Sequence, residues 1–292
     1  MKFSIVTITH NRAHLIGKTI QSVLNQSYSD FEHIIIDDGS TDETEIVVKN
    51  FNDKRIKYFQ YPKNDKRSYL RNEGIRKATG TILCFLDSDD LWTSDKLETL
   101  RTIFNQNPEI SFVIHNIAFL PAIEVQEKIF TKFQNDYKGF VLNEVLNDDI
   151  LPFPTFSIRK EALDKIGLLD ENLLDGQHDL YLRAAAQLQF YYCSRTLTTM
   201  VKHSGNISAK PNLTHYEDYF KSLEKLQKEN YISRKSLQML KGKTYSKIAY
   251  IYHRQKNFSL AKENYQNSYR SYLWNYHGLK SYLMHLKLKL FV

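Results

Sequence analysis

Apolar and polar positions alternate in blocks along the first 118 residues, and each block predicts one strand or one helix. Short runs rich in apolar residues, which are typical of strands in a buried parallel sheet, occur at residues 3–9, 32–36, 55–61, 82–86 and 111–118. Between these runs, apolar residues recur at every third or fourth position, which is the spacing of one helix face. This alternation predicts an α/β fold whose mostly parallel, Rossmann-like central sheet is flanked by helices.

Polar clusters directly follow three of the predicted strands. They lie at residues 9–11 (Thr-His-Asn), 37–38 (Asp-Asp) and 87–90 (Asp-Ser-Asp-Asp). Ligands of open α/β sheets bind outside the carboxyl ends of the strands, so we expect these clusters to converge on one edge. No Gly-x-Gly-x-x-Gly follows the first strand, and no Gly-Lys-Ser/Thr loop occurs. The dinucleotide fingerprint and the P-loop are therefore not predicted.

The acidic turn at 87–90 places three carboxylates, those of Asp87, Asp89 and Asp90, within four residues. Like charges this close repel one another, and unpaired charges are unfavourable to bury, so something must neutralise them. Hard oxygen ligands at the end of a strand suit Mg²⁺ or Mn²⁺, especially a metal that also holds phosphate. The structural alternative is that Asp90 or Thr93 caps the helix that follows.

The character of the chain changes near residue 215, where it becomes helical, charged and rich in tyrosine. We therefore divide it into a domain at 1–210, with halves at about 1–118 and 119–210, and an all-helical extension at 211–292. Residues 121–139 are polar and predict a mobile loop. The end, 279–292, mixes lysine with Leu, Tyr, Met and Phe, and such a basic amphipathic helix can lie on an anionic membrane or dock on the first domain.

Composition and charge narrow the possible partners. The formal net charge of +7 favours anionic partners such as nucleotide phosphates, an acidic lipid surface or nucleic acid. Nucleic-acid binding is not expected, because the tyrosines follow helical core spacing and not a basic, base-stacking stripe. Cys84 and Cys193 lie in apolar runs, which indicates reduced core residues and a cytoplasmic protein. We expect no signal peptide and no membrane-spanning segment.

Several motifs, taken together in their order and spacing, resemble family 2 glycosyltransferases with the GT-A fold. The resemblance covers roughly residues 1–205. It rests on residues 4–12 (SIVTITHNR), 22–27 (SVLNQS), 37–42 (DDGSTD), 71–74 (RNEG), 78–80 (ATG), 85–90 (FLDSDD) and 167–171 (GLLDE). Many such proteins build bacterial surface polysaccharides from nucleotide sugars. The resemblance makes 1–118 the nucleotide-sugar half and 119–210 the acceptor half of a catalytic domain.

The resemblance implies a hexosyltransferase that moves a sugar from a nucleotide sugar, with a UDP-sugar expected, to a hydroxyl group. The acceptor would be a glycan or lipid-linked saccharide of lipopolysaccharide, capsule or exopolysaccharide. Departure of the nucleoside diphosphate leaves negative charge, which Mn²⁺ or Mg²⁺ stabilises. A sugar hydroxyl attacks well only when a carboxylate takes its proton, and attack opposite the leaving group inverts the anomeric centre. The protein would work on the cytoplasmic face of the membrane, with peripheral contact through its C-terminal helix.

The resemblance also implies residue roles. Thr9 lies along the donor base and Asp38 hydrogen-bonds it, while Asp87 meets the ribose and contributes to the metal site. Asp89 is the principal metal ligand, and His203 either ligates the metal or touches the diphosphate. Further donor contacts fall on His10, Asn11, Arg12, Lys66, Arg67, Arg71 and Ser88.

The resemblance also implies that Asp179 takes the position of the catalytic base. The Glu-Asp pair of the family appears here as His178-Asp179, and Ile8 stands where proline is common. Two other functions compete with transfer. A nucleotidyltransferase is disfavoured by the missing glycine-rich loop. A non-catalytic nucleotide-sugar-binding or scaffold protein of the same pathway is favoured by His178 and disfavoured by intact Asp89 and Asp179.

Overall fold

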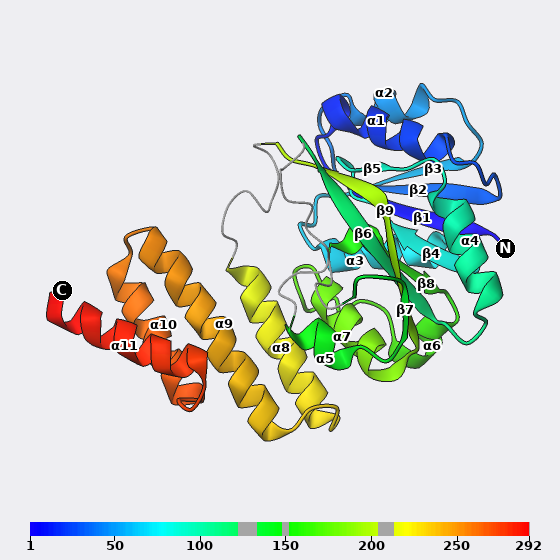
Figure 1. Cartoon of the computed structure of the whole chain (residues 1–292). Coiled ribbons are helices and arrows are strands. Elements are labelled where there is room, and N and C mark those ends of the chain that lie inside the picture. Colours follow the sequence, from blue (N-terminus) through cyan, green and yellow to red (C-terminus); the bar gives the residue numbers. More distant parts are fainter. Residues whose placement is uncertain (122–132, 148–151, 204–212, 292) are drawn as a thin grey trace. The chain divides into compact units, whose positions relative to one another are not determined.

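The computed structural model describes residues 1–121, 133–147, 152–203 and 213–291. The chain forms two compact units, Met1–Ser204 and Gly205–Val292 (Figure 1). Most of the loop predicted at 121–139 lies outside the described residues, but its end is a short strand and not loop. None of the helices in the described part of the chain combines the length and apolar character that a membrane crossing requires.

A mixed sheet, nine-stranded within the described residues, forms the centre of the first unit. Its strands in spatial order are β3 (Ile56–Tyr61), β2 (Phe31–Asp38), β1 (Phe3–Thr9), β4 (Ile82–Phe85), β8 (Phe156–Arg159), β6 (Phe112–Leu120), β9 (Phe190–Val201) and β5 (Leu91–Trp92), with β7 (Tyr137–Gly139) also paired to β9.

The first four strands in this order are mutually parallel, as the alternating pattern predicted. Strand β8 then lies antiparallel between β4 and β6, which makes the sheet mixed. Because β1, β2 and β4 are parallel, their carboxyl ends meet at one edge of the sheet. That edge receives the three polar clusters.

Seven helices and one 3-10 turn complete the first unit. They are α1 (Ala13–Leu24), α2 (Thr44–Lys49), α3 (Arg67–Lys77), α4 (Lys96–Gln106), α5 (Leu142–Asn147), η1 (Phe153–Thr155), α6 (Ala162–Ile166) and α7 (Gln177–Gln187), all within the described residues. Helices α3 and α4 cover opposite faces of β1, since Ile5 joins the core under α4 while Val6 contacts Gly74 of α3. A Cβ atom at Gly74 would stand 2.4 Å from Val6, so this close approach needs glycine.

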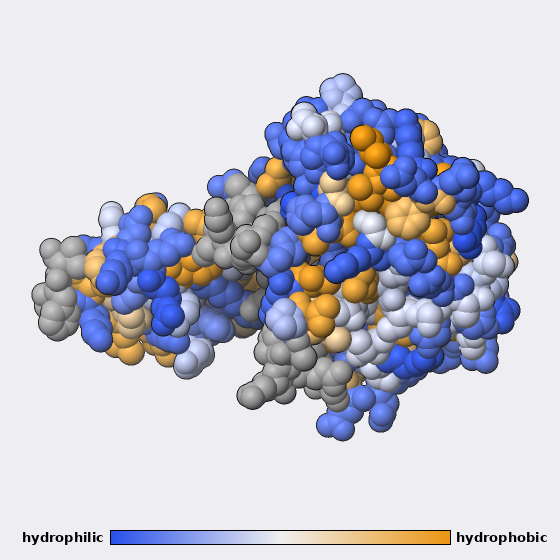
Figure 2. Space-filling view, turned by 90° about the horizontal axis from the view of Figure 1, so that it is seen from above, coloured by the Kyte–Doolittle hydropathy of each residue, from blue (hydrophilic) through white to orange (hydrophobic). Residues whose placement is uncertain are grey.

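The second unit consists of helices α8 (Thr214–Lys228), α9 (Arg234–Arg254), α10 (Phe258–Ser271) and α11 (Tyr276–Phe291). A small core of Ala249, Ala261, Tyr265 and Leu288 joins the last three helices. Ser233 and Asn257 cap the starts of α9 and α10 by accepting backbone N–H groups. Hydrophobic residues also reach the surface of this unit (Figure 2).

Strand β2 buries two titratable side chains in the middle of the sheet. Burial alone would raise the pKa of Glu32, but hydrogen bonds from Lys57, Ser4 and Thr79 outweigh it and lower the pKa to about 2. Burial lowers the pKa of His33 to about 3, and its Nε2 atom lies 2.9 Å from Thr7 Oγ1. His33 is therefore neutral in the folded protein at pH values well above 3.

Lowering the pH from 6.5 to 5 should reduce the free energy of unfolding of the first unit. Unfolded His33 takes up a proton below its ordinary pKa of 6.5, whereas folded His33 does not, so the unfolded state gains protons and stability falls with pH. The slope from one such histidine is about 1.4 kcal/mol per pH unit. The His33→Gln variant should lose this share of the slope.

Urea unfolding followed by Trp92 fluorescence in a Trp274→Phe background measures this slope, because these are the two tryptophans of the chain. The exposed His14 provides the matched control, and His14→Gln should keep the full pH dependence. An equal slope in the parent and in His33→Gln would mean that folded His33 is protonated as readily as unfolded His33.

Candidate functional site

The ends of β1 and β2 are tied together by Asn11. Its backbone is left-handed (φ 51°), which asparagine tolerates well, and its N–H donates to Ser40 Oγ at 2.8 Å. Asn11 Oδ1 accepts the N–H of Thr41 at 2.8 Å, and the N–H of Arg12 donates to Thr44 Oγ1 at 3.0 Å. These contacts shape the loop and hold the first two polar clusters side by side.

Two buried polar atoms at the end of β1 have no hydrogen-bond partner within the described residues. They are Oγ1 of Thr9 and Nδ1 of His10. Buried polar atoms are almost always paired, so an unpaired pair of them at one strand end indicates a place for a ligand. The resemblance to family 2 glycosyltransferases implies that the donor base binds at this strand end.

Asp38, the other residue expected to meet the base, is buried and already paired. Lys63 Nζ donates to its carboxylate at 2.5 Å, and the N–H of Asn64 does so at 2.7 Å. Asp38 therefore anchors the loop that leads from β3 to α3. Sequence reasoning missed Lys63, because a lysine in a polar loop looks like an ordinary solvated charge.

Two arginines of α3 meet one buried carboxylate. Asp175 accepts hydrogen bonds from Arg67 Nε at 2.7 Å and from Arg71 Nη1. The Arg71 guanidinium stacks 4.4 Å from the Phe153 ring centroid, and its Nη2 lies 3.7 Å from Asp87 Oδ1. Nη2 of Arg67 is buried with no partner among the described residues. The cluster presents positive charge beside the acidic turn. Asp175 itself was not predicted, since nothing in the sequence marks its distant partners.

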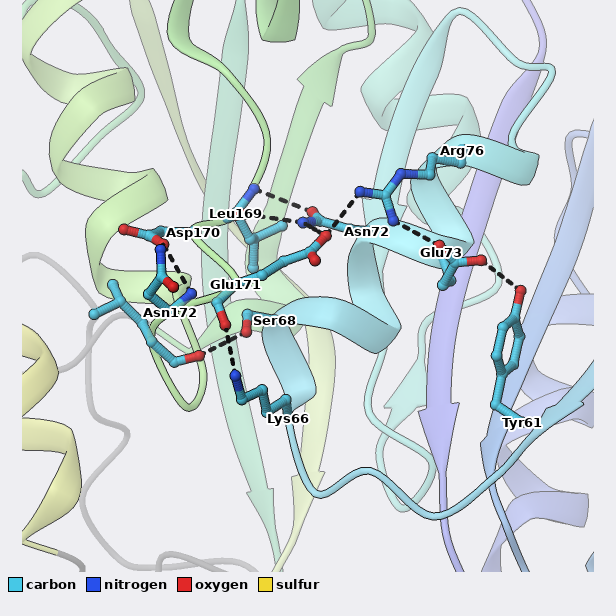
Figure 3. A network of polar contacts seen from close by, with 11 residues as sticks. Tyr61, Lys66, Ser68, Asn72, Glu73, Arg76, Leu169, Asp170, Glu171 and Asn172 are labelled. Carbon is cyan, nitrogen blue, oxygen red and sulfur yellow. Dashed lines mark hydrogen bonds and ion pairs between the residues drawn. The ribbon is translucent and has the colours of Figure 1, made fainter.

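A polar network ties α3 to the loop between α6 and α7 (Figure 3). Asn72 Nδ2 donates to the Leu169 carbonyl at 2.9 Å and to Glu171 Oε1 at 2.8 Å, while Asn72 Oδ1 accepts the Leu169 N–H at 3.1 Å. Arg76 bridges Glu171 and Glu73. Lys66, predicted as a donor contact, donates to the Glu171 carbonyl at 3.2 Å. The motifs 71–74 and 167–171 are thus one structural unit.

Hydrogen bonds connect the acidic turn to β9 and α1. Buried Asp90 accepts the Val201 N–H at 3.1 Å, and its carbonyl accepts Thr19 Oγ1 at 3.0 Å. The alternative that Asp90 or Thr93 caps the next helix is wrong, because α4 begins at Lys96 and no side chain caps it. Asp90 instead places the end of β9 beside the turn.

That placement brings His203 to Asp89, with 2.9 Å between Nε2 and Oδ2. Asp87 keeps 41% of its side chain exposed, and Ser88 between them is buried. Loss of solvation around its carboxyl group raises the pKa of Asp87 to about 6; Arg71 opposes this shift and Asp89 adds to it. Burial, reinforced by Asp87 and Asp89, also raises the pKa of Asp90 well above its ordinary range.

The turn therefore has an excess of negative charge that a divalent cation would relieve. No three acidic, histidine or cysteine side chains within the described ranges converge as a complete metal site. Mg²⁺ and Mn²⁺ need fewer, because substrate phosphates and water commonly complete their coordination around one or two carboxylates. Asp89, which lies 2.9 Å from His203, and the half-exposed Asp87 would supply these one or two carboxylates.

Asp179, in the first turn of α7, is 2% exposed. Arg183 grips its carboxylate through Nε at 2.8 Å and Nη2 at 2.7 Å. The same guanidinium donates to the carbonyls of Ile166 and Leu168. The expected base is thus fixed in orientation by an ion pair that also holds the loop before α7.

A buried lysine, which was not predicted from the sequence, fixes one of the turns of the site. Lys96 Nζ donates to the Pro154 carbonyl at 2.9 Å and to Thr198 Oγ1 at 3.2 Å, and burial lowers its pKa to about 7. It thereby fixes the turn that carries Phe153, on which Arg71 stacks.

Comparison with known proteins agrees with this geometry. Residues 4–167, more than half of the chain, match Glycosyl transferase family 2. An uncharacterized glycosyltransferase of Rickettsia conorii is 33% identical over 177 residues, which are 60% of this chain and 28% of that protein. The chain spans only 25% to 54% of the length of the first curated relatives that it matches.

Other similarities extend further along the chain. The GalNAc(5)-diNAcBac-PP-undecaprenol beta-1,3-glucosyltransferase of Campylobacter jejuni is 28% identical over 284 residues, covering 92% of this chain and 86% of that protein. The UDP-Glc:alpha-D-GlcNAc-diphosphoundecaprenol beta-1,3-glucosyltransferase WfgD of Escherichia coli is 37% identical over 113 residues, 39% of this chain and 44% of that protein.

Among solved structures, S. aureus TarS 1-349 in complex with UDP-GlcNAc superposes with a TM-score of 0.71 at 18% identity, covering 93% of this chain and 83% of that one. The predicted GT-A fold is confirmed. From the family match, the motifs and the fold together, this chain belongs to glycosyl transferase family 2.

Proposed function

We propose that this protein is an inverting, metal-dependent glycosyltransferase that uses a UDP-sugar donor. The observation that carries the proposal is the set of unpaired buried polar atoms on Thr9, His10 and Arg67, next to an acidic turn with an excess of negative charge. A base, a diphosphate and a divalent cation would satisfy these groups together.

The acceptor we propose is a lipid-linked saccharide in the synthesis of a surface polysaccharide such as lipopolysaccharide, capsule or exopolysaccharide. Two relatives are named for undecaprenol-linked acceptors and glucosyl transfer, and a structural neighbour holds UDP-GlcNAc. The reaction would take place on the cytoplasmic face of the membrane, with peripheral contact through the C-terminal helix. The buried free cysteines, Cys84 and Cys193, support a reducing compartment.

In this proposal the residues divide the work by position. Thr9, His10 and Asp38 hold the base, and Arg67 and Arg71 face the diphosphate. Asp87 meets the ribose. These groups orient the anomeric carbon before the acceptor arrives, which removes much of the entropic cost of the encounter.

A divalent ion held by Asp89, Asp87 and His203 would stabilise the charge of the departing nucleoside diphosphate. Asp179 takes the proton of the acceptor hydroxyl as that oxygen attacks opposite the leaving group, and the anomeric configuration inverts. The ion pair with Arg183 holds the Asp179 carboxylate in one orientation for this task.

One observation favours a second candidate, a non-catalytic nucleotide-sugar-binding or scaffold protein. Asp179 is almost fully buried, and its partner Arg183 also donates to the carbonyl of Leu168. An ion pair of this kind can serve to hold a loop in place. In that case the donor site would be intact and no transfer would follow.

The donor site is tested by nucleotide-sugar binding with and without Mn²⁺. We expect calorimetry to show metal-dependent binding of a UDP-sugar that is weakened about tenfold or more, or 1.4 kcal/mol and above, in Asp89→Ala. Asp30, an exposed carboxylate before β2, provides the control, and Asp30→Ala should bind like the parent. Equal binding by Asp89→Ala and the parent would leave the acidic turn without a role in donor binding.

The base is tested with Asp179→Asn, which keeps the shape of the side chain and removes its charge. We expect sugar transfer to fall by about 10² to 10⁴ while donor binding stays within twofold, because a general base acts only in the transition state. Thermal unfolding of the same variant measures the contribution of the Arg183 pair. Full transfer by the folded variant would assign Asp179 a purely structural role.

A further inference from the structure

Helix α11 buries polar side chains and exposes apolar ones, the reverse of the usual arrangement in a globular protein. Ser281 is fully buried and donates to Ser246 Oγ at 3.1 Å, and His285 is buried with Nδ1 3.1 Å from the Lys262 carbonyl. In contrast, Leu283 is 65% exposed and Leu279 is 47% exposed. Within the described part of this helix, Leu288 belongs to the core of the second unit, whereas Leu279 and Leu283 remain exposed outside it.

We call the set of exposed apolar side chains on α11 and just before it the α11 apolar face. It consists of Trp274, Tyr276, Leu279, Tyr282, Leu283 and Leu286. Successive helix residues are rotated by about 100°, so the five members within α11 fall inside an arc of about 120°. The buried residues lie on the opposite side of the helix. Exposed Lys280 and Lys287 border the arc along one edge.

The charge of the chain is divided unequally between the units. Residues 205–292 contain 16 Lys and Arg against 5 Asp and Glu, a formal charge of +11, whereas residues 1–204 contain 24 against 28, a charge of −4. The positive net charge thus belongs entirely to the helical unit. An apolar face on a unit of this charge would meet strong repulsion from a second copy of itself.

We propose that the α11 apolar face inserts into the headgroup region of an anionic phospholipid bilayer, with Lys280 and Lys287 at the lipid phosphates. The leucines supply apolar area, and the exposed Trp274 and Tyr276 are of the residue types that concentrate at membrane interfaces. Basic residues of the whole unit add long-range attraction to the anionic surface. This inference deepens the proposed function, since it rests on an acceptor that is itself held in a membrane.

The test is cosedimentation of the full-length protein with vesicles of phosphatidylcholine alone or mixed with phosphatidylglycerol. We expect binding to the anionic vesicles, at least tenfold weaker binding to the neutral ones, and weakening with added salt. Leu283→Glu should reduce anionic-vesicle binding by tenfold or more. Tyr250→Glu, which makes the same charge change at a 55% exposed apolar residue of α9, should bind within twofold of the parent.

Two further readouts make the result decisive. Trp274 is 80% exposed while Trp92 is buried, so vesicle binding through the α11 apolar face should shift tryptophan emission to the blue. UDP-sugar binding by Leu283→Glu should equal that of the parent, which separates failure of this inference from failure of the donor site. Absence of vesicle binding by the parent, equal binding by Leu283→Glu, or a dimer that Leu283→Glu dissociates would each overturn the proposal.

Discussion

The crowding of carboxylates at the carboxyl edge of the sheet is the constraint on which the rest of the first unit depends. Each acid there must find compensation, because buried charges without partners are strongly unfavourable. Asp38 is paired with a lysine, Asp175 with two arginines and Asp179 with one. Among the acids of the turn, Asp87 lies 3.7 Å from Arg71, Asp89 lies 2.9 Å from His203, and Asp90 accepts the N–H of Val201. The acidic turn is therefore compensated less directly than the carboxylates that are held by close lysine and arginine pairs.

The same pairings connect parts of the chain that are about a hundred residues apart. Asp175 lies two residues before α7, so its ion pairs with Arg67 and Arg71 join α3 to the helix that carries Asp179. Asn72, the residue after Arg71, connects α3 to the loop between α6 and α7 through the backbone of Leu169. A buried ion pair adds little net stability. Its value here lies in fixing the arginines and α7 in one arrangement.

The strands of the parallel part were predictable because burial on both faces leaves a nearly unbroken apolar run in the sequence. The short strands β5 and β7 were not, since two or three residues become a strand only by pairing with β9. Lys96 escaped prediction for a related reason. Its partners, Pro154 and Thr198, are 58 and 102 residues away in sequence, and nothing local distinguishes a buried lysine from a solvated one. Periodicity likewise predicted α11 but not which of its faces is buried.

The net charge of +7 does not by itself distinguish binding of a nucleotide sugar from binding of an anionic surface. The unequal charges of the two units do distinguish them. A unit with a formal charge of −4 repels a nucleotide sugar at long range, so the donor affinity that we propose would have to come from nearby positive groups such as Arg67 and Arg71. Such contacts are close and shielded from solvent, and salt screens them weakly. Attraction between the helical unit and an anionic surface acts across water, where screening within about 8–10 Å at physiological salt is strong. If both proposals hold, salt would therefore weaken membrane attachment far more than recognition of the donor, because the two depend on charges in different dielectric surroundings.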